Sequence, residues 1–115
     1  MLENRDYCDY DTCVALKELG FNALVDWYFN EDKRIVSSLA TYRNTYIPRI
    51  SLYEAQKWLR EEYNLHLEIT YSPSCWTGKI YDLKEWDYIK GFTFFESFED
   101  TFHTLIKEAI KILKK

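Results

Sequence analysis

The chain has 115 residues, of which 18% are aromatic and 30% are charged, and its formal net charge is −4. This length predicts a single domain over residues 1–115, because compact domains most often contain about 100–150 residues. The acidic balance argues against a nucleic-acid partner of the duplex type, and the lack of an apolar run near the roughly 20 residues that span a bilayer argues against a membrane partner.

The first predicted element is a short helix over about residues 12–19. Asp11 or Thr12 is expected to cap its free N–H groups, because side-chain oxygens of these residue types accept hydrogen bonds there. Gly20 follows the last apolar residue and is expected to end the helix, since glycine tolerates the left-handed conformation of a helix C-terminus.

A β-hairpin is predicted next. Residues 23–29 and 34–42 are rich in Val, Ile and aromatic side chains, and the polar link NEDK separates them. The second run also fits a loop. Pro48 is expected to stop whatever precedes it, because proline has no backbone N–H to donate.

The stretch SLYEAQKWLREEYNLHLEITY, residues 51–71, predicts a helix followed directly by a strand. Ser51 and Glu54 have the spacing of a capping box at the start of the helix, and Asn64 is expected to end it in a left-handed turn. Helical periodicity puts an apolar stripe on the inner face, made of Leu52, Ala55, Leu59 and Tyr63. The same periodicity puts Trp58 at the edge of that stripe.

Three strands and a helix are predicted in the remainder. Residues 66–71 alternate, with Leu67, Ile69 and Tyr71 on the buried face. Residues 76–81 and 92–95 are the next strands, and DLKEWDYIKG is expected to be a long turn or a distorted hairpin link between them. Ser97 is expected to cap the last helix, whose apolar residues recur at helical spacing. They are Phe98, Phe102, Leu105, Ile106, Ala109, Ile112 and Leu113.

The order of these elements predicts the fold class. Short links between the late strands require antiparallel pairing, because parallel strands need a long crossover connection. We therefore expect an α+β fold, with a small antiparallel sheet of three to five strands and about three helices packed mainly on one face.

The segment SLYEAQKWLRE followed by NLHLEI resembles small uncharacterised proteins encoded by phages and prophages of Bacteroides-type gut bacteria. The proline before the helix, the segment KELGFN at residues 17–22 and the late helix FESFEDTFHTLIKEAIKIL are also similar. The resemblance implies an intracellular accessory protein of a mobile element. It implies no activity and no site residues.

Neither a catalytic nor a metal nor a cofactor site is predicted. His66 and His103 have no nucleophile pattern beside them, and Cys8, Cys13 and Cys75 form no CxxC pair. With no signal-like apolar segment at the acidic start, the three thiols are expected to be reduced, in the cytoplasm. An unrecognised enzyme stays open only if a deep pocket holds Cys75 or a histidine.

A basic and aromatic window at residues 41–60 is the candidate binding region. Tyr53, Lys57 and Arg60 are expected on the water-facing side of the second helix. The candidate binding residues are Arg43, Tyr46, Arg49, Tyr53, Lys57, Trp58 and Arg60. Arginine with aromatic residues is typical of interface hot spots and of single-strand stacking platforms.

Three interpretations of this window stay open. The residues can merely seal and solvate the rim of the core, they can bind a protein, or they can bind a nucleotide or single-stranded nucleic acid. The leading hypothesis is a non-enzymatic protein-interaction module whose partner is a host or phage protein or a second copy in a homodimer. Nucleotide or single-strand binding is the alternative.

Overall fold

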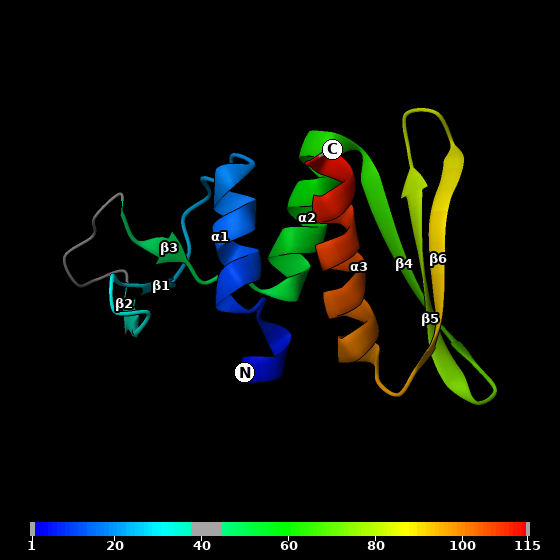
Figure 1. Cartoon of the computed structure of the whole chain (residues 1–115), viewed down its shortest axis with the longest axis horizontal. Coiled ribbons are helices and arrows are strands. Elements are labelled where there is room, and N and C mark those ends of the chain that lie inside the picture. The colour runs from blue at the N-terminus through cyan, green and yellow to red at the C-terminus, as the bar shows by residue number, and fades with distance from the viewer. Residues whose placement is uncertain (1, 38–44, 115) are drawn as a thin grey trace. The chain divides into compact units, whose positions relative to one another are not determined.

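The computed structural model describes residues 2–37 and 45–114. The chain divides into two compact units, Met1–Ser51 and Leu52–Lys115. Each unit has a three-stranded antiparallel sheet, with strand orders β2-β1-β3 and β4-β5-β6 (Figure 1). With three α-helices in the described residues, the predicted α+β class is confirmed. The single domain over residues 1–115 stays a prediction.

In the first unit, a 3₁₀ turn at Asn4–Asp6 precedes helix α1, Tyr10–Glu18. The predicted cap at Asp11 or Thr12 is wrong, because both residues lie inside the helix. The N-cap is Asp9, whose Oδ1 accepts a hydrogen bond from the Thr12 backbone N–H at 2.8 Å. The helix therefore starts earlier than its apolar periodicity indicated, since the cap precedes the apolar residues by a full turn.

The predicted end of α1 at Gly20 is confirmed. Gly20 has a φ of 111°, in the left-handed region that glycine enters without a steric penalty. The Gly20 N–H donates to the Lys17 carbonyl at 3.0 Å, and the Phe21 N–H donates to the Leu16 carbonyl at 3.0 Å. These two bonds make a Schellman motif, which satisfies carbonyl groups that the helix leaves without partners.

The predicted hairpin is present but shorter than expected. Strand β1, Trp27–Phe29, pairs antiparallel with β2, Ile35–Ser37, and with β3, Ile47–Pro48. The rest of the second predicted run, residues 38–44, lies outside the described residues. Pro48 sits in an edge strand opposite Tyr28, where a missing N–H costs no ladder bond between strands.

The N-terminal segment is joined to the end of the first unit through two cysteines. The Cys8 N–H donates to the Ile50 carbonyl at 2.9 Å, and the Ile50 N–H donates to the Cys13 Sγ at 3.4 Å. Cys8 and Cys13 flank the Asp9 cap and are both buried. They occupy the positions of a hydrophobic staple, which fixes how the chain enters a helix.

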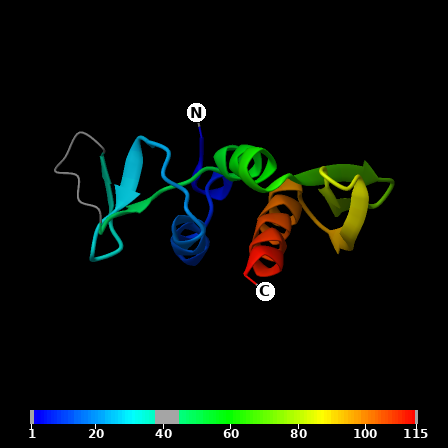
Figure 2. The same ribbon diagram turned by 90° about the horizontal axis from the view of Figure 1, so that it is seen from above.

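The second unit contains α2 (Leu52–Tyr63), β4 (Leu65–Ser72), β5 (Cys75–Asp82), β6 (Asp87–Phe95) and α3 (Phe98–Leu113). Helix α3 packs against all three strands and α2 packs against β4 and α3. Figures 1 and 2 show both helices on the same side of the sheet. This arrangement confirms the prediction that the helices pack mainly on one face of the sheet.

The helices of the second unit bury the stripes that periodicity predicted, with small differences. Leu52, Ala55 and Leu59 of α2 are buried, and Tyr63 is half-buried. Buried side chains of α3 are Thr101, Phe102, Leu105, Ile106, Ala109 and Ile110. Ser97 caps α3 by accepting from the Asp100 N–H at 3.0 Å, as predicted. Asn64, with a φ of 57°, ends α2 in the predicted left-handed turn.

The face of the sheet that α3 covers is identified by two close approaches. Gly78 of β5 lies under Leu105, where a Cβ would come within 2.9 Å of that side chain. The Trp76 ring meets the Phe98 ring edge-on at 5.5 Å. Tyr71, predicted to be buried on this face, is 59% exposed because it lies near the end of β4.

Of the two alternatives predicted for the link between the last two strands, the structure has the distorted hairpin and not the long turn. Strand β6 begins at Asp87, so only residues 83–86 form the turn and five further residues belong to the strand. The pairing of β5 with β6 shifts register between Ile80 and Tyr81. This irregularity, typical of a β-bulge, interrupts the alternation that would have identified residues 87–91 as strand.

Candidate functional site

The structure divides the predicted binding residues between the two units. Tyr46 and Arg49 belong to the first unit, and Arg43 lies outside the described residues. The other four predicted residues, Tyr53, Lys57, Trp58 and Arg60, all lie on α2 in the second unit. The two groups are therefore separate candidates.

Arg49 is engaged within its own unit. Its guanidinium carbon lies 3.8 Å from the centroid of the Tyr7 ring, which is a cation–π contact. Its Nη2 donates to the Asn4 Oδ1 at 2.7 Å. These contacts hold the N-terminal segment in place, so the half-buried Arg49 side chain stabilises the fold of the first unit.

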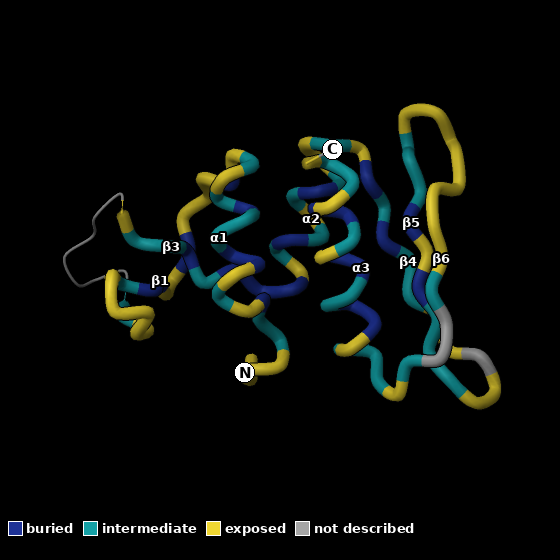
Figure 3. Tube along the Cα trace, viewed as in Figure 1, coloured by how far each residue is buried: buried dark blue, intermediate teal, exposed yellow. Residues whose placement is uncertain are grey.

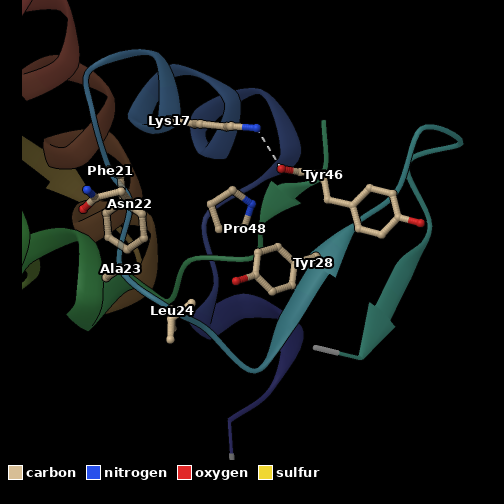
Figure 4. Close-up of a pocket in the computed structure, with 8 residues that line it drawn as sticks. All are labelled: Lys17, Phe21, Asn22, Ala23, Leu24, Tyr28, Tyr46 and Pro48. Atoms are coloured by element: carbon tan, nitrogen blue, oxygen red, sulfur yellow. Dashed lines mark hydrogen bonds between the residues drawn. The ribbon is translucent and has the colours of Figure 1, made fainter. Parts of the chain in front are cut away.

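Tyr46 lies at a small pocket of the first unit (Figure 4). The Lys17 ammonium donates to the Tyr46 carbonyl oxygen at 2.9 Å, and the Tyr46 ring points away from the Pro48 ring. The cavity volume is about 140 Å³. Its lining is Lys17, Phe21, Asn22, Ala23, Leu24, Tyr28, Tyr46 and Pro48.

This lining is apolar and aromatic apart from one ammonium group and one amide. It contains neither Cys75 nor a histidine, so it is not the pocket that the enzyme hypothesis required. A cavity of about 140 Å³ is also well below the roughly 300–1,000 Å³ of typical small-molecule sites. The pocket fits at most one side chain of a partner.

The three α2 residues that were expected to face water form one continuous row. Tyr53, Lys57 and Arg60 are spaced by four and three residues, which places them on the same helix face. Tyr53 is 57% exposed, Lys57 is exposed and Arg60 is half-buried. We call these three residues the α2 surface.

The Tyr53 ring is held in place although it is exposed. It meets the buried Phe102 ring of α3 edge-on, with the centroids 5.7 Å apart and the planes at 85°. Edge-to-face pairs of this kind stabilise an aromatic ring by about 0.5–1.5 kcal/mol beyond area burial. The ring of Tyr53 is thus presented to solvent in a fixed orientation.

Trp58 does not belong to the α2 surface. Five residues separate it from Tyr53, which corresponds to about 140° around a helix. The Trp58 side chain is half-buried, and its ring packs edge-on against Tyr63 at 5.3 Å. Its position between core and solvent agrees with the edge position that periodicity predicted.

The charge on α2 is less basic than the window of residues 41–60 suggested. Two cations, Lys57 and Arg60, share the helix with three carboxylates, Glu54, Glu61 and Glu62. The Lys57 Nζ lies 4.0 Å from the Glu61 Oε1. The cations and Tyr53 occupy one side of the helix, and the Glu61 carboxylate that pairs with Lys57 lies beside them.

The thiols offer no accessible nucleophile in the first unit. Hydrogen bonding with Cys8 lowers the pKa of the Cys13 thiol, against its burial, which raises that pKa. Cys13 is fully buried, so no substrate reaches it. Cys75 is half-buried at the start of β5. Within residues 2–37 and 45–114, no three His, Cys, Asp or Glu side chains gather closely enough to hold a metal ion.

Comparisons with protein-family models, with curated proteins and with solved structures find no match to this chain. In the described part of the chain, no helix is both long and apolar enough to cross a bilayer. Function is therefore inferred from the geometry of the chain itself.

The sequence did not identify the most exposed aromatic side chain of the described residues. Trp86 is 87% exposed at the turn between β5 and β6, and Tyr88 follows it at 57%. Both lie in the segment that was expected to be a long turn or a distorted hairpin link. The available signal was a tryptophan four residues after Asp82, at a turn position where glycine or asparagine is usual.

Proposed function

We propose that the protein is a non-enzymatic interaction module that binds another protein through the α2 surface. The observation that supports this best is the Tyr53 ring, which is exposed, contacts Phe102 edge-on and is followed along the same helix face by Lys57 and Arg60. Tyrosine and arginine are enriched among the residues that dominate binding energy at interfaces. A ring that is already oriented loses little conformational entropy on binding.

The chemistry of the α2 surface favours a partner segment that has both carboxylates and an apolar group. Lys57 and Arg60 attract the carboxylates, while the face of the Tyr53 ring accepts the apolar group. The resemblance to phage and prophage proteins suggests a host or phage protein as the source of this segment. A second copy of the chain is the other partner that the sequence left open.

Nucleotide or single-strand binding has weaker support. A stacking platform for nucleic acid needs a basic groove along the backbone, whereas three carboxylates share α2 with the two cations. Arg49, which the basic window included, is occupied by Tyr7 and Asn4. We therefore give the nucleic-acid alternative its own arm in the experiment.

The experiment is a quantitative pull-down with the wild-type chain and two charge-reversal variants. Lys57→Glu/Arg60→Glu inverts the α2 surface, and Arg34→Glu is the control at an exposed position of the first unit. We expect a protein that the wild type and the control capture equally and that the double variant loses. Capture of the same proteins by all three chains would contradict the proposal.

The nucleic-acid arm uses single-stranded oligonucleotides and common nucleotides at low salt, with tryptophan fluorescence as the readout. The proposal predicts unchanged fluorescence for the wild type. Quenching that weakens steeply with salt and disappears in Lys57→Glu/Arg60→Glu would replace protein binding by nucleic-acid binding at the same surface.

A further inference from the structure

The end of the second unit's sheet presents a continuous exposed segment. Residues 84–91, which include the β5–β6 turn and the first half of β6, are all exposed (Figure 3). Trp86, Tyr88 and Ile89 lie within it and are 87%, 57% and 38% exposed. Tryptophan and tyrosine in such density are unusual for a solvated surface and typical of a binding surface.

The turn holds Trp86 in a conformation that its residue type disfavours. The Asp82 Oδ1 accepts hydrogen bonds from the Lys84 N–H at 2.9 Å and the Glu85 N–H at 3.4 Å, which fixes the turn. Trp86 follows with a φ of 60°, in the left-handed region. Glycine or asparagine would occupy this position without strain. Retained strain of this kind clusters at functional sites.

A row of rings continues from Tyr88 across the sheet. Tyr88 pairs with Tyr81 of β5, which pairs with His66 of β4. The ring centroids are 5.9 Å apart for the tyrosine pair and 6.4 Å apart for Tyr81 and His66. Alternation along β5 puts this row on the face opposite Gly78 and Leu105, away from α3.

The Tyr88 ring can pack against this face of the sheet because residue 91 is a glycine. A Cβ at position 91 would collide with the Tyr88 hydroxyl group, so a larger residue there would displace the ring. The position of the Tyr88 ring in this row therefore depends on the glycine at position 91.

The charges around Trp86 indicate the class of partner. Three carboxylates, those of Asp82, Glu85 and Asp87, lie within six residues of chain beside one ammonium, that of Lys84. This balance repels the phosphates of nucleic acid and of anionic lipid. It attracts a protein segment with Lys or Arg beside an apolar anchor.

Addition of a partner strand to the free edge of β6 is disfavoured by the strand itself. Its pairing with β5 has two register shifts, and such bulges twist an edge away from a new strand. Lys90 also turns toward the helices, where its Nζ lies 3.5 Å from the Glu108 Oε1. An inward charge of this kind protects an edge against pairing.

We propose that Trp86 and Tyr88, with the neighbouring carboxylates, form a second docking surface for a protein segment whose apolar anchor is flanked by Lys or Arg. Its chemistry is opposite to that of the α2 surface, which attracts carboxylates. The two surfaces are carried by different elements, so either can fail a test while the other passes.

The test is a selection of random short peptides on the full chain, with counter-selection on Trp86→Gly. This substitution removes the indole and relieves the backbone, so we expect the variant to fold. We expect basic peptides with an aliphatic or aromatic anchor. For the best synthetic peptide, anisotropy should show binding that weakens about tenfold or more in Trp86→Gly and in Gly91→Ala. Rising salt should also weaken it.

Two controls make the result specific. Lys33→Gly makes the same kind of change at another left-handed turn position, in the first unit, and should bind the peptide like the wild type. Lys57→Glu/Arg60→Glu should also bind normally, which separates this surface from the α2 surface.

The proposal is overturned by any of four results. The first is that no peptide prefers the wild type over Trp86→Gly, and the second is enrichment of acidic peptides. The third is binding of oligonucleotides or of phosphatidylserine vesicles that depends on Trp86. The fourth is self-association of the chain that Trp86→Gly abolishes. The last result would make a second copy the occupant.

Discussion

The exposed ring of Tyr53 and the buried ring of Phe102 meet edge-on, with centroids 5.7 Å apart and planes at 85°. One ring lies largely in solvent and the other is 1% exposed. The contact therefore connects the α2 surface directly to the core between α2 and α3. The proposed binding at Tyr53 and the stability of the second unit therefore depend on one interaction.

This shared contact predicts that Tyr53→Ala and Tyr53→Phe behave differently. Removing the ring should lower the free energy of unfolding by at least about 0.5–1.5 kcal/mol, because lost area burial adds to the usual value of an edge-to-face pair. Tyr53→Phe keeps the ring and should unfold at the wild-type urea concentration. Equal loss in both variants would mean that the hydroxyl group, and not the ring, stabilises this position.

Helix α3 packs so closely on β5 at Gly78 that no side chain fits there. A Cβ at this position would come within 2.9 Å of Cγ, Cδ1 and Cδ2 of Leu105, which is fully buried. Gly78→Ala should lower the free energy of unfolding by about 1–3 kcal/mol, as overpacking does. Lys79→Ala, at an exposed position on the other face of the same strand, is the matched control.

A double-mutant cycle tests the cause of that loss. In a Leu105→Ala background there is room for the new methyl group, so Gly78→Ala should cost much less than it does in the wild type. An undiminished cost in that background would show that the backbone at Gly78, and not Leu105, sets the limit.

The three thiols should react in a fixed order. Cys75 is half-buried, whereas Cys8 and Cys13 are 3% and 0% exposed. An aromatic disulfide reagent at neutral pH should label one thiol per folded chain rapidly, and Cys75→Ser should remove that signal. Cys8 and Cys13 should react only on unfolding, because a buried thiolate cannot attack the reagent. This holds although hydrogen bonding lowers the pKa of the Cys13 thiol. Rapid labelling of Cys8 or Cys13 in the native protein would contradict the staple at the start of α1.

Trp86→Gly should stabilise the protein. A left-handed backbone costs a non-glycine residue roughly 1–2 kcal/mol, and glycine's larger unfolded-state entropy offsets part of this. We therefore expect a net gain of up to about 1 kcal/mol in the free energy of unfolding. Denaturant unfolding of Trp86→Gly beside Trp86→Ala measures it, since alanine removes the indole but keeps the strain. A glycine variant less stable than the wild type would show that packing of the indole stabilises the folded protein.

The sequence predicted elements well where side-chain chemistry acts locally. Gly20, Asn64 and Ser97 mark helix ends through their own backbone or side-chain preferences. The inner stripes of α2 and α3 also follow from periodicity, because long amphipathic helices present a repeated pattern. These features need no knowledge of distant contacts.

The sequence failed where structure depends on pairing between strands. The bulge near Tyr81 breaks the alternation in β6, so residues 87–91 gave no strand pattern and Trp86 was missed. The basic window also overestimated one candidate, because the contact of Arg49 with Tyr7 joins residues far apart in the chain. A composition window cannot detect that a charge is already occupied.

The most direct test of the α2 surface is hydroxyl-radical footprinting of the wild-type chain, free and bound to the protein that it captures. Tyr53 is 57% exposed, so it should be oxidised readily in the free chain and strongly protected in the complex. Tyr71, at 59% exposed on β4, is the internal reference and should be oxidised equally in both. Undiminished oxidation of Tyr53 in the complex would contradict binding through the α2 surface.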